Sequence, residues 1–152
     1  MAVRMADRIV KAAEWTPSET LRTEYLPRAL ALLREIASDP KKLEWCSGYT
    51  VYFPYEDTFG LDREFDWFIE ASYQEGLVVK DYFDYVEHFA QKMYSSDPEW
   101  LHTLSMEELL SCIAVHFRRD HHSNGSLIEE SVPSGAMLRL LEELRKRVPE
   151  DN

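Results

Sequence analysis

The strongest constraint on the fold is a pair of helical patterns near the C-terminus, joined by a short polar segment. In residues 105–117, apolar side chains recur every three or four positions, which is typical of one buried helix face. Ser105 and Glu108 have the spacing of a capping box, in which each side chain binds the other residue's backbone N–H at a helix start. A leucine-rich pattern over residues 134–148 predicts a second helix. Because two such faces can bury each other, we expect a helix, a polar elbow and a helix over residues 105–148.

The elbow carries charged and polar side chains, and it ends at Asn124-Gly125, a turn signal because Gly adopts positive φ without strain. Arg118 is the first polar residue after the apolar stripe. We expect Arg118 to point inward and to pair with a carboxylate, from Asp120 or from the helix expected at 62–75. Arg119, on the next face, is expected to be exposed.

The second helix carries acidic residues four positions before basic ones. Glu142 precedes Lys146, and Glu143 precedes Arg147, which is the favourable orientation for side-chain pairs on a helix. We therefore expect these pairs to support the helix.

This stretch resembles the C-terminal half of a small bacterial family of unknown function. The family has a helix ending in Arg-x-Glu-Arg-Phe-x-x-Gly, then a second Gly and a Leu-rich helix. The matching positions are Arg118, Asp120 and Gly125 in the motif, Gly135 for the second glycine, and Leu138, Leu141 and Leu144 in the helix. His121 and His122 replace the Arg and Phe of the family.

The resemblance extends upstream. Residues 65–70 are similar to an aromatic helix of the family, and residues 76–78 are similar to the Gly-Leu-Val turn that ends that helix. The likeness covers roughly residues 45–147. It implies one helical domain and supplies no function, because the family has no established activity.

Length and charge limit the class of protein. A chain of 152 residues is about one domain. With 28 acidic and 17 basic residues, its net charge is -11, which repels the phosphates of nucleic acids. We therefore expect no direct nucleic-acid binding, and a basic protein is the partner that the charge favours.

The cellular compartment follows from cysteine use and hydropathy. The two cysteines, Cys46 and Cys112, lack metal-binding or redox spacing, which favours reduced thiols in a cytoplasm. Cys112 lies on the apolar side of its helix and is expected to be buried. No apolar run reaches the ~18 residues of a membrane span, and no signal peptide is visible. These features predict a cytoplasmic protein without a membrane contact; they leave the oligomeric state open.

The N-terminal 40 residues are expected to form helices. Residues 3–15 have a short helical pattern, and Thr16 is expected to cap a second helix, with Pro17 in the first turn. Pro27 is expected to break or kink that helix because proline removes a backbone hydrogen bond. A clean apolar stripe follows to Ile36.

The middle of the chain is expected to divide into an aromatic loop, residues 41–61, and central helices, residues 62–104. Residues 49–53 and 77–79 are β-prone, so at most a small two-stranded sheet is expected there. Asp62 is expected to cap a helix that ends at Gly76, and a second helix is expected to begin at Asp81 and reach Met93. Asp97-Pro98 is expected to open a short helical turn that buries Trp100 and Leu101. The sequence predicts a compact all-α single domain, residues 1–152, of about six helices.

The densest group of reactive side chains lies around the elbow. It comprises His116, Arg118, Asp120, His121 and His122. His116 and Asp120 share a helix face, and imidazole with carboxylate suits a transition metal. The ligand set is incomplete, however, so we expect neither a metal nor another cofactor. We favour a solvated helix end, where basic residues complement the helix dipole.

Aromatic residues gather in the loop at 41–61, and acidic residues flank them. The candidate binding residues are Trp45, Tyr49, Tyr52, Tyr55, Glu56 and Asp57, with Phe53 and Phe59 beside them. Their rings either pin the loop to the core or anchor a basic protein partner. No catalytic residue is assigned, because the sequence has no phosphate-binding loop and no nucleophile elbow.

Two functions remain. The first is a non-enzymatic acidic interaction or regulatory protein, such as a bacterial or phage inhibitor of a basic, nucleic-acid-handling protein; this analogy rests on size and charge. The alternative is a small-molecule or metal-dependent enzyme with its site at the elbow, from His116 to Asn124.

Overall fold

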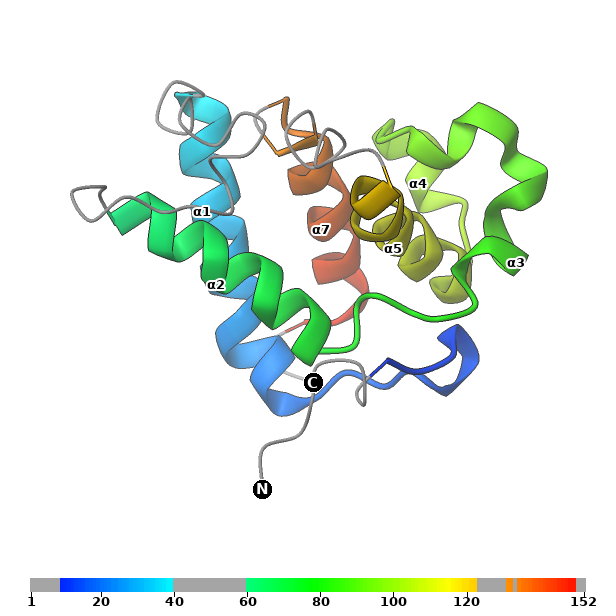
Figure 1. The fold of residues 1–152 in the computed structure, drawn as a ribbon, viewed down its shortest axis with the longest axis horizontal. Coiled ribbons are helices and arrows are strands. Elements are labelled where there is room, and N and C mark those ends of the chain that lie inside the picture. The colour runs from blue at the N-terminus through cyan, green and yellow to red at the C-terminus, as the bar shows by residue number, and fades with distance from the viewer. Residues whose placement is uncertain (1–8, 40–59, 123–130, 133, 150–152) are drawn as a thin grey trace.

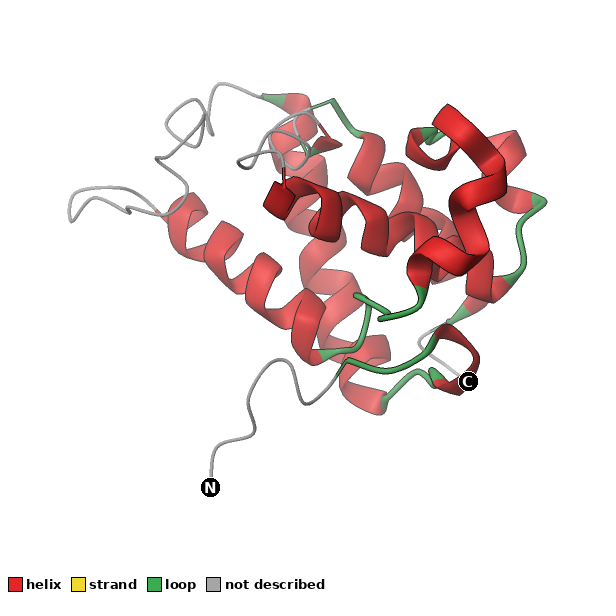
Figure 2. Cartoon of the chain, turned by 45° about the vertical axis from the view of Figure 1, so that its right-hand side comes forward, coloured by secondary structure: helices red, strands yellow, loops and turns green. Residues whose placement is uncertain are grey.

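A computed structural model describes residues 9–39, 60–122, 131–132 and 134–149. This part of the chain contains helices and no strand (Figure 2), which confirms the predicted all-α fold. The α-helices are α1 (Leu26–Ser38), α2 (Gly60–Gln74), α3 (Tyr82–Val86), α4 (Pro98–His102), α5 (Met106–His122) and α7 (Ala136–Arg147). Three further segments are helical but not α-helical. These are the 3-10 segments η2 (Ala12–Glu14) and η6 (Glu87–Tyr94) and the π-helical segment η3 (Leu21–Tyr25).

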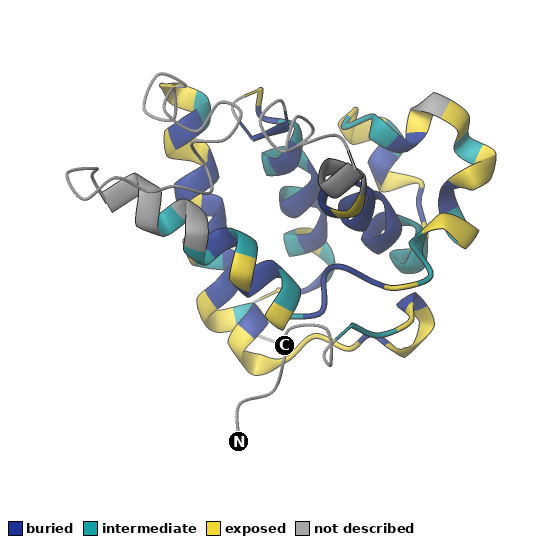
Figure 3. Ribbon diagram, in the orientation of Figure 1, coloured by how far each residue is buried: buried dark blue, intermediate teal, exposed yellow. Residues whose placement is uncertain are grey.

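The core of the fold surrounds α5. Every residue from Leu109 to Phe117 is buried (Figure 3). In the described part of the chain, four elements pack against α5: the helices α3 and α7 and the segments η2 and η6. Helix α1 does not belong to this group and packs instead against α7 and α2 (Figure 1). One apolar stripe was expected on this helix. The polar residues Ser111 and His116 are buried as well, because neighbours cover α5 on several sides.

The start of α5 confirms the predicted capping box. The Ser105 N–H donates to Glu108 Oε1 at 2.9 Å, and the Glu108 N–H donates to Ser105 Oγ at 3.1 Å. The end of α5 differs from the expectation. The helix runs to His122, five residues past Phe117, so the first half of the expected elbow is helical.

The N-terminal segment is less helical than expected. Among the described residues of the predicted helix 3–15, only the 3-10 turn η2 forms. The next helix is capped by Ser18, not by Thr16, since Ser18 Oγ accepts a hydrogen bond from the Leu21 N–H at 2.9 Å. At the predicted kink, the chain forms the π-helical segment η3 immediately before α1, and the Leu26 N–H donates to the Leu21 carbonyl. Pro27 has no N–H, and this wider turn lets the helix continue through it.

Two polar contacts join α1 and its N-terminal extension to α2. The buried Tyr25 hydroxyl donates to Ser72 Oγ at 2.6 Å, and Ser72 in turn donates to the Phe68 carbonyl at 2.7 Å. On the surface, the Arg28 guanidinium binds both carboxylate oxygens of Glu64 and lies 3.8 Å from the ring centre of Trp67. These contacts fix the crossing of α1 and α2.

A buried connection leads from α2 to α3. Gly76 has φ 79° and ends α2 as predicted, although the helix begins at Gly60 and therefore includes Asp62 instead of being capped by it. Residues 77–79 are buried but form no strand. The Lys80 N–H donates to the Val10 carbonyl, and Asp81 Oδ1 accepts from the Ala12 N–H, so the N-terminal segment docks here.

The helix predicted from Asp81 to Met93 is broken. Its first turn is α3, and its second part is η6, which consists of two short 3-10 turns. Ala90 interrupts η6 with φ 55° and ψ -129°. After it, Asp97 Oδ1 accepts from the Glu99 N–H and caps α4, which buries Leu101 and leaves Trp100 partly exposed.

Helix α7 closes the domain. Gly135 precedes it with φ 88°, a conformation that an L side chain adopts only with strain, so glycine is required at this turn. The leucine-rich face is buried against α1, α4 and α5, as predicted. The helix ends at Arg147, two residues before Pro149.

Candidate functional site

The structure separates His116 from Arg118, two of the residues that the sequence grouped at the elbow. His116 is buried, with 3% of its surface exposed, whereas Arg118 is exposed. The prediction that Arg118 points inward is therefore wrong, because α5 continues as a helix and carries that position to the surface. Asp120, His121 and His122 lie on the last turn of α5, and their side chains are outside the described part.

The buried pair Cys112 and His116 is inert packing in this conformation. His116 Nδ1 donates to the Cys112 carbonyl at 2.9 Å, which leaves Nε2 as the unprotonated nitrogen of a neutral ring. Burial lowers the pKa of His116 from its usual value, and the hydrogen bond to the Cys112 carbonyl opposes this only in part. Burial and the nearby Glu108 carboxylate raise the pKa of Cys112 to about 12, so the thiolate is not available as a nucleophile.

The aromatic binding surface predicted at Trp45, Tyr49, Tyr52, Tyr55, Glu56 and Asp57 lies outside the described residues. It stays a prediction. Among the described residues, acidic and aromatic side chains gather at a different place, which the sequence analysis did not single out.

This second region is the acidic lobe, which we define as residues 81–108: α3, η6, α4 and the first turn of α5. It contains seven Asp or Glu residues and one Lys, so it carries a net charge of -6 out of the total of -11. The acidic residues are Asp81, Asp84, Glu87, Asp97, Glu99, Glu107 and Glu108. A charge count in a sliding window along the sequence would have found this segment.

The fold brings part of this charge together around one tyrosine. Partial burial, followed by the negative charges of Asp81, Glu107 and Asp84, raises the pKa of Tyr85. The three carboxylates come from the turn before α3, from α3 itself and from the first turn of α5. Because α3 packs directly on α5, residues more than twenty positions apart in the sequence contribute to one negative field.

The acidic lobe also carries an exposed aromatic ring. Phe83 is 45% exposed and is the single large hydrophobic residue that the described part of the chain leaves exposed. Its ring contacts Tyr82 edge to face at 6.4 Å between centroids, so Tyr82 supports it from one side. The acidic lobe therefore presents one large apolar ring among its carboxylates.

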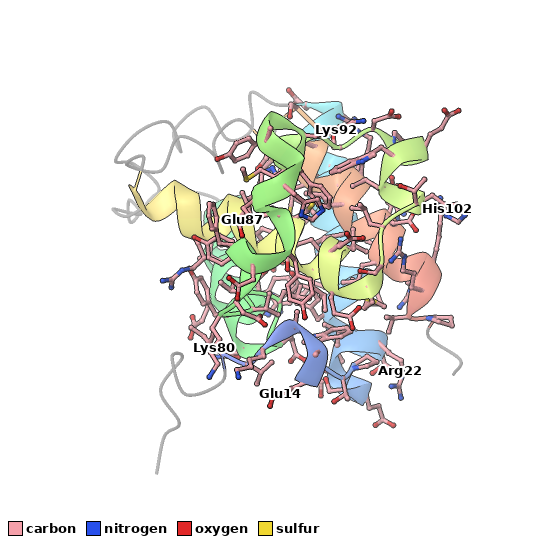
Figure 4. All side chains as sticks on the ribbon, turned by 90° about the vertical axis from the view of Figure 1, so that its right-hand side faces the viewer. Glu14, Arg22, Lys80, Glu87, Lys92 and His102 are labelled. Atoms are coloured by element: carbon pink, nitrogen blue, oxygen red, sulfur yellow. The ribbon has the colours of Figure 1, made fainter. Side chains whose placement is uncertain are left out.

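Few positive charges offset the lobe. Lys92 Nζ lies 5.6 Å from the ring centre of Trp100, and His88 Nε2 lies 3.8 Å from Glu108 Oε2. Figure 4 shows this side of the molecule, with Glu87 and Lys92 on η6 and His102 at the end of α4. None of these three basic groups is among the causes of the pKa shift of Tyr85, whose charged contributors are all carboxylates.

A second polar cluster surrounds a buried carboxylate on α7. Glu143 is 3% exposed, and its Oε2 accepts from Arg147 Nε at 3.0 Å. Arg147 Nη2 also donates to the Leu101 carbonyl at 2.9 Å, while His102 Nδ1 lies 3.5 Å from Glu143 Oε2. The predicted Glu143–Arg147 pair is thus confirmed, and it joins α4 to α7. Glu142 differs from the prediction, because it pairs with Arg34 on α1 while Lys146 lies near Glu143.

The described residues contain no candidate metal site and no candidate membrane span. No group of three or more His, Cys, Asp or Glu side chains there could hold a metal ion. No helix in that part has the length and apolar character needed to cross a bilayer.

These features define an acidic, all-α domain with a charged lobe on one side. Residues 23–150 match the family of unknown function DUF6508, and the chain belongs to that family. The match confirms the resemblance to a family of unknown function and extends it toward the N-terminus. No curated protein matches the chain, and no solved structure matches it.

Proposed function

We propose that this chain is a cytoplasmic, non-enzymatic interaction protein whose acidic lobe binds a basic protein partner. The observation that carries the proposal is the concentration of a net charge of -6 in residues 81–108, beside the exposed Phe83. A partner that handles nucleic acid has a basic surface for phosphates, and carboxylates presented at phosphate-like positions compete for it. The specific form we propose is a regulator or inhibitor of such a partner.

Charge and the aromatic anchor have different roles in this proposal. The carboxylates raise the association rate and select a basic surface, and this effect falls as salt screens the charges. Phe83 supplies apolar area that salt does not screen. Asp84 and Glu87 are both exposed on α3 and η6, so they are the charges that a partner reaches first.

The test uses a deca-arginine peptide as a basic probe, with affinity measured by calorimetry at several NaCl concentrations. We expect the double variant Asp84→Asn/Glu87→Gln to weaken binding roughly fivefold at low salt and to flatten the salt dependence. Phe83→Ala is expected to weaken binding at every salt concentration, by roughly tenfold if the ring acts as an anchor.

The matched control is Glu19→Gln/Glu24→Gln, which removes two exposed charges from the N-terminal helical turns, outside the lobe. It has the same net charge as the double variant of the lobe. Equal weakening by both double variants would mean that the peptide responds to net charge alone, which contradicts the proposal. Absence of binding by the unaltered protein at low salt would contradict it too.

A further inference from the structure

The segment η6 contains one strained backbone position. It consists of two short 3-10 turns that meet at a kink, because the backbone of Ala90 between them is not helical. Ala90, in its middle, has φ 55° and is the one non-glycine residue with positive φ in the described part of the chain. An alanine in this region stores strain, since its Cβ crowds the neighbouring backbone.

Side-chain contacts near both ends of η6 lie along a single face of α5. Near its start, His88 Nε2 lies 3.8 Å from Glu108 Oε2. At its end, the Tyr94 ring packs edge to face against His116, with 6.2 Å between centroids. Glu108 and His116 are eight residues apart, so they lie on the same face of the helix, two turns from each other.

Cys112 lies between these two contact points. It is four residues from Glu108 and four from His116, so the three side chains form one stripe along α5 between its two contacts with η6. Cys112 is fully buried and His116 nearly so. In the folded domain the stripe therefore holds a thiol and an imidazole that solvent does not reach.

The outer side of η6 has little to hold it. Glu87, His88, Ala90 and Lys92 are exposed. On the inner side, Met93 is buried, and Phe89 packs edge to face on Trp100 at 5.3 Å between centroids. Few buried contacts and a strained backbone are the features of a segment that opens locally, well before the whole domain unfolds.

We propose that η6 is a strained strap, which opens as a unit while the rest of the domain stays folded and thereby uncovers the Glu108–Cys112–His116 stripe of α5. The strain at Ala90 lowers the free energy of opening. The contacts of Phe89, Met93 and Tyr94 oppose opening. The strap lies within the acidic lobe, but its opening is inferred from backbone strain and packing and does not require a bound partner.

The test measures the reactivity of Cys112 with 5,5′-dithiobis(2-nitrobenzoate) in native buffer, in a Cys46→Ser background so that one thiol reports. The Cys112 thiolate attacks the reagent disulfide, a mixed disulfide forms and one thionitrobenzoate is released and measured. Glycine adopts positive φ without strain, so Ala90→Gly is expected to slow labelling by about five- to tenfold. Phe89→Ala, which removes the contact with Trp100, is expected to accelerate it.

The control is Ala31→Gly at an exposed position of α1, which lowers global stability without touching η6. If the strap opens locally, Ala31→Gly leaves the labelling rate unchanged, and the rate far exceeds that of global unfolding. A labelling rate equal to the global unfolding rate, accelerated by Ala31→Gly and not slowed by Ala90→Gly, would overturn the proposal. Hydrogen exchange of the Met93 and Tyr94 amides gives a second readout, which must be faster than exchange in α7.

Discussion

At the scale of single residues, burial decides which polar side chains contribute to the free energy of unfolding. Glu143 and Glu142 are neighbours on α7, yet the first is 3% exposed and binds Arg147, while the second is partly exposed and lies 3.5 Å from Arg34. A buried carboxylate that loses its charge leaves its cationic partner without compensation, whereas water replaces a lost surface contact. The two positions should therefore respond differently to the same change.

We predict that Glu143→Gln lowers the free energy of unfolding by about 2 kcal/mol, because Arg147 keeps its bond to the Leu101 carbonyl but loses its charged acceptor. Glu142→Gln should cost less than about 0.5 kcal/mol. Urea unfolding of both variants under the same conditions measures the difference. Similar small losses at both positions would mean that the cluster does not stabilise the α4–α7 contact.

A second prediction at this scale concerns pH. Burial lowers the pKa of His116 in the folded state, so as pH falls the unfolded chain takes up a proton first. Neutral His116 therefore contributes to the free energy of unfolding. This contribution is complete above the unfolded pKa of ~6.5, and it is lost as pH decreases below that value, by at most about 1.4 kcal/mol per pH unit.

The measurement is the urea midpoint between pH 7.5 and pH 5.5. His116→Gln should show a shallower decrease than the unaltered protein, whatever its own stability at pH 7.5. His88 and His102 are present in both proteins, so they do not affect the comparison. Parallel curves would contradict the prediction.

At the scale of elements, helix boundaries depend on which side chain reaches the backbone. Ser105 and Glu108 cap α5 as the sequence predicts, since the capping box is a local pattern. At the start of the helical turns that lead through η3 into α1, both Thr16 and Ser18 are good capping residues. Ser18 is selected because its hydroxyl also donates to Glu75 Oε1 at 2.7 Å, a residue beyond the end of α2.

We predict that Ser18→Ala lowers stability by about 1 kcal/mol, because it removes the cap on the Leu21 N–H and the contact with Glu75. Thr16→Ala, two residues earlier and exposed, should change stability by less than about 0.5 kcal/mol. Thermal unfolding of the pair distinguishes the two caps. A larger loss at Thr16 would place the start of the helix earlier in solution.

At the scale of the whole molecule, charge is unevenly distributed. The acidic lobe, with its net charge of -6, is built on α3, η6 and α4, and covers one side of α5. On the opposite side, α1, α2 and α7 carry acidic and basic residues that form ion pairs, such as Arg28–Glu64 and Arg34–Glu142. Repulsion within the lobe opposes folding, and it is the long-range term that salt screens most.

We predict that raising NaCl from low concentration to 0.5 M stabilises the protein, since screening relieves repulsion among an excess of acidic residues. The double variant Asp84→Asn/Glu87→Gln should be more stable than the unaltered protein at low salt and gain less from added NaCl. Urea unfolding at both salt concentrations measures this. Destabilisation by salt would show that surface ion pairs outweigh the repulsion.

The sequence by itself determined the features that rest on local patterns. These are the all-α class, the capping box of α5, the Gly76 end of α2, the burial of Cys112 and the Glu143–Arg147 pair, because each depends on residues within one or two helical turns. Only the tertiary structure decided where distant elements meet. It placed η6 along α5 and buried His116, it continued α5 through Arg118 to the surface, and it gathered Asp81, Asp84 and Glu107 around Tyr85. Packing between elements set these outcomes, because the spacing of residues along the chain indicates an apolar helix face but not which distant element covers it.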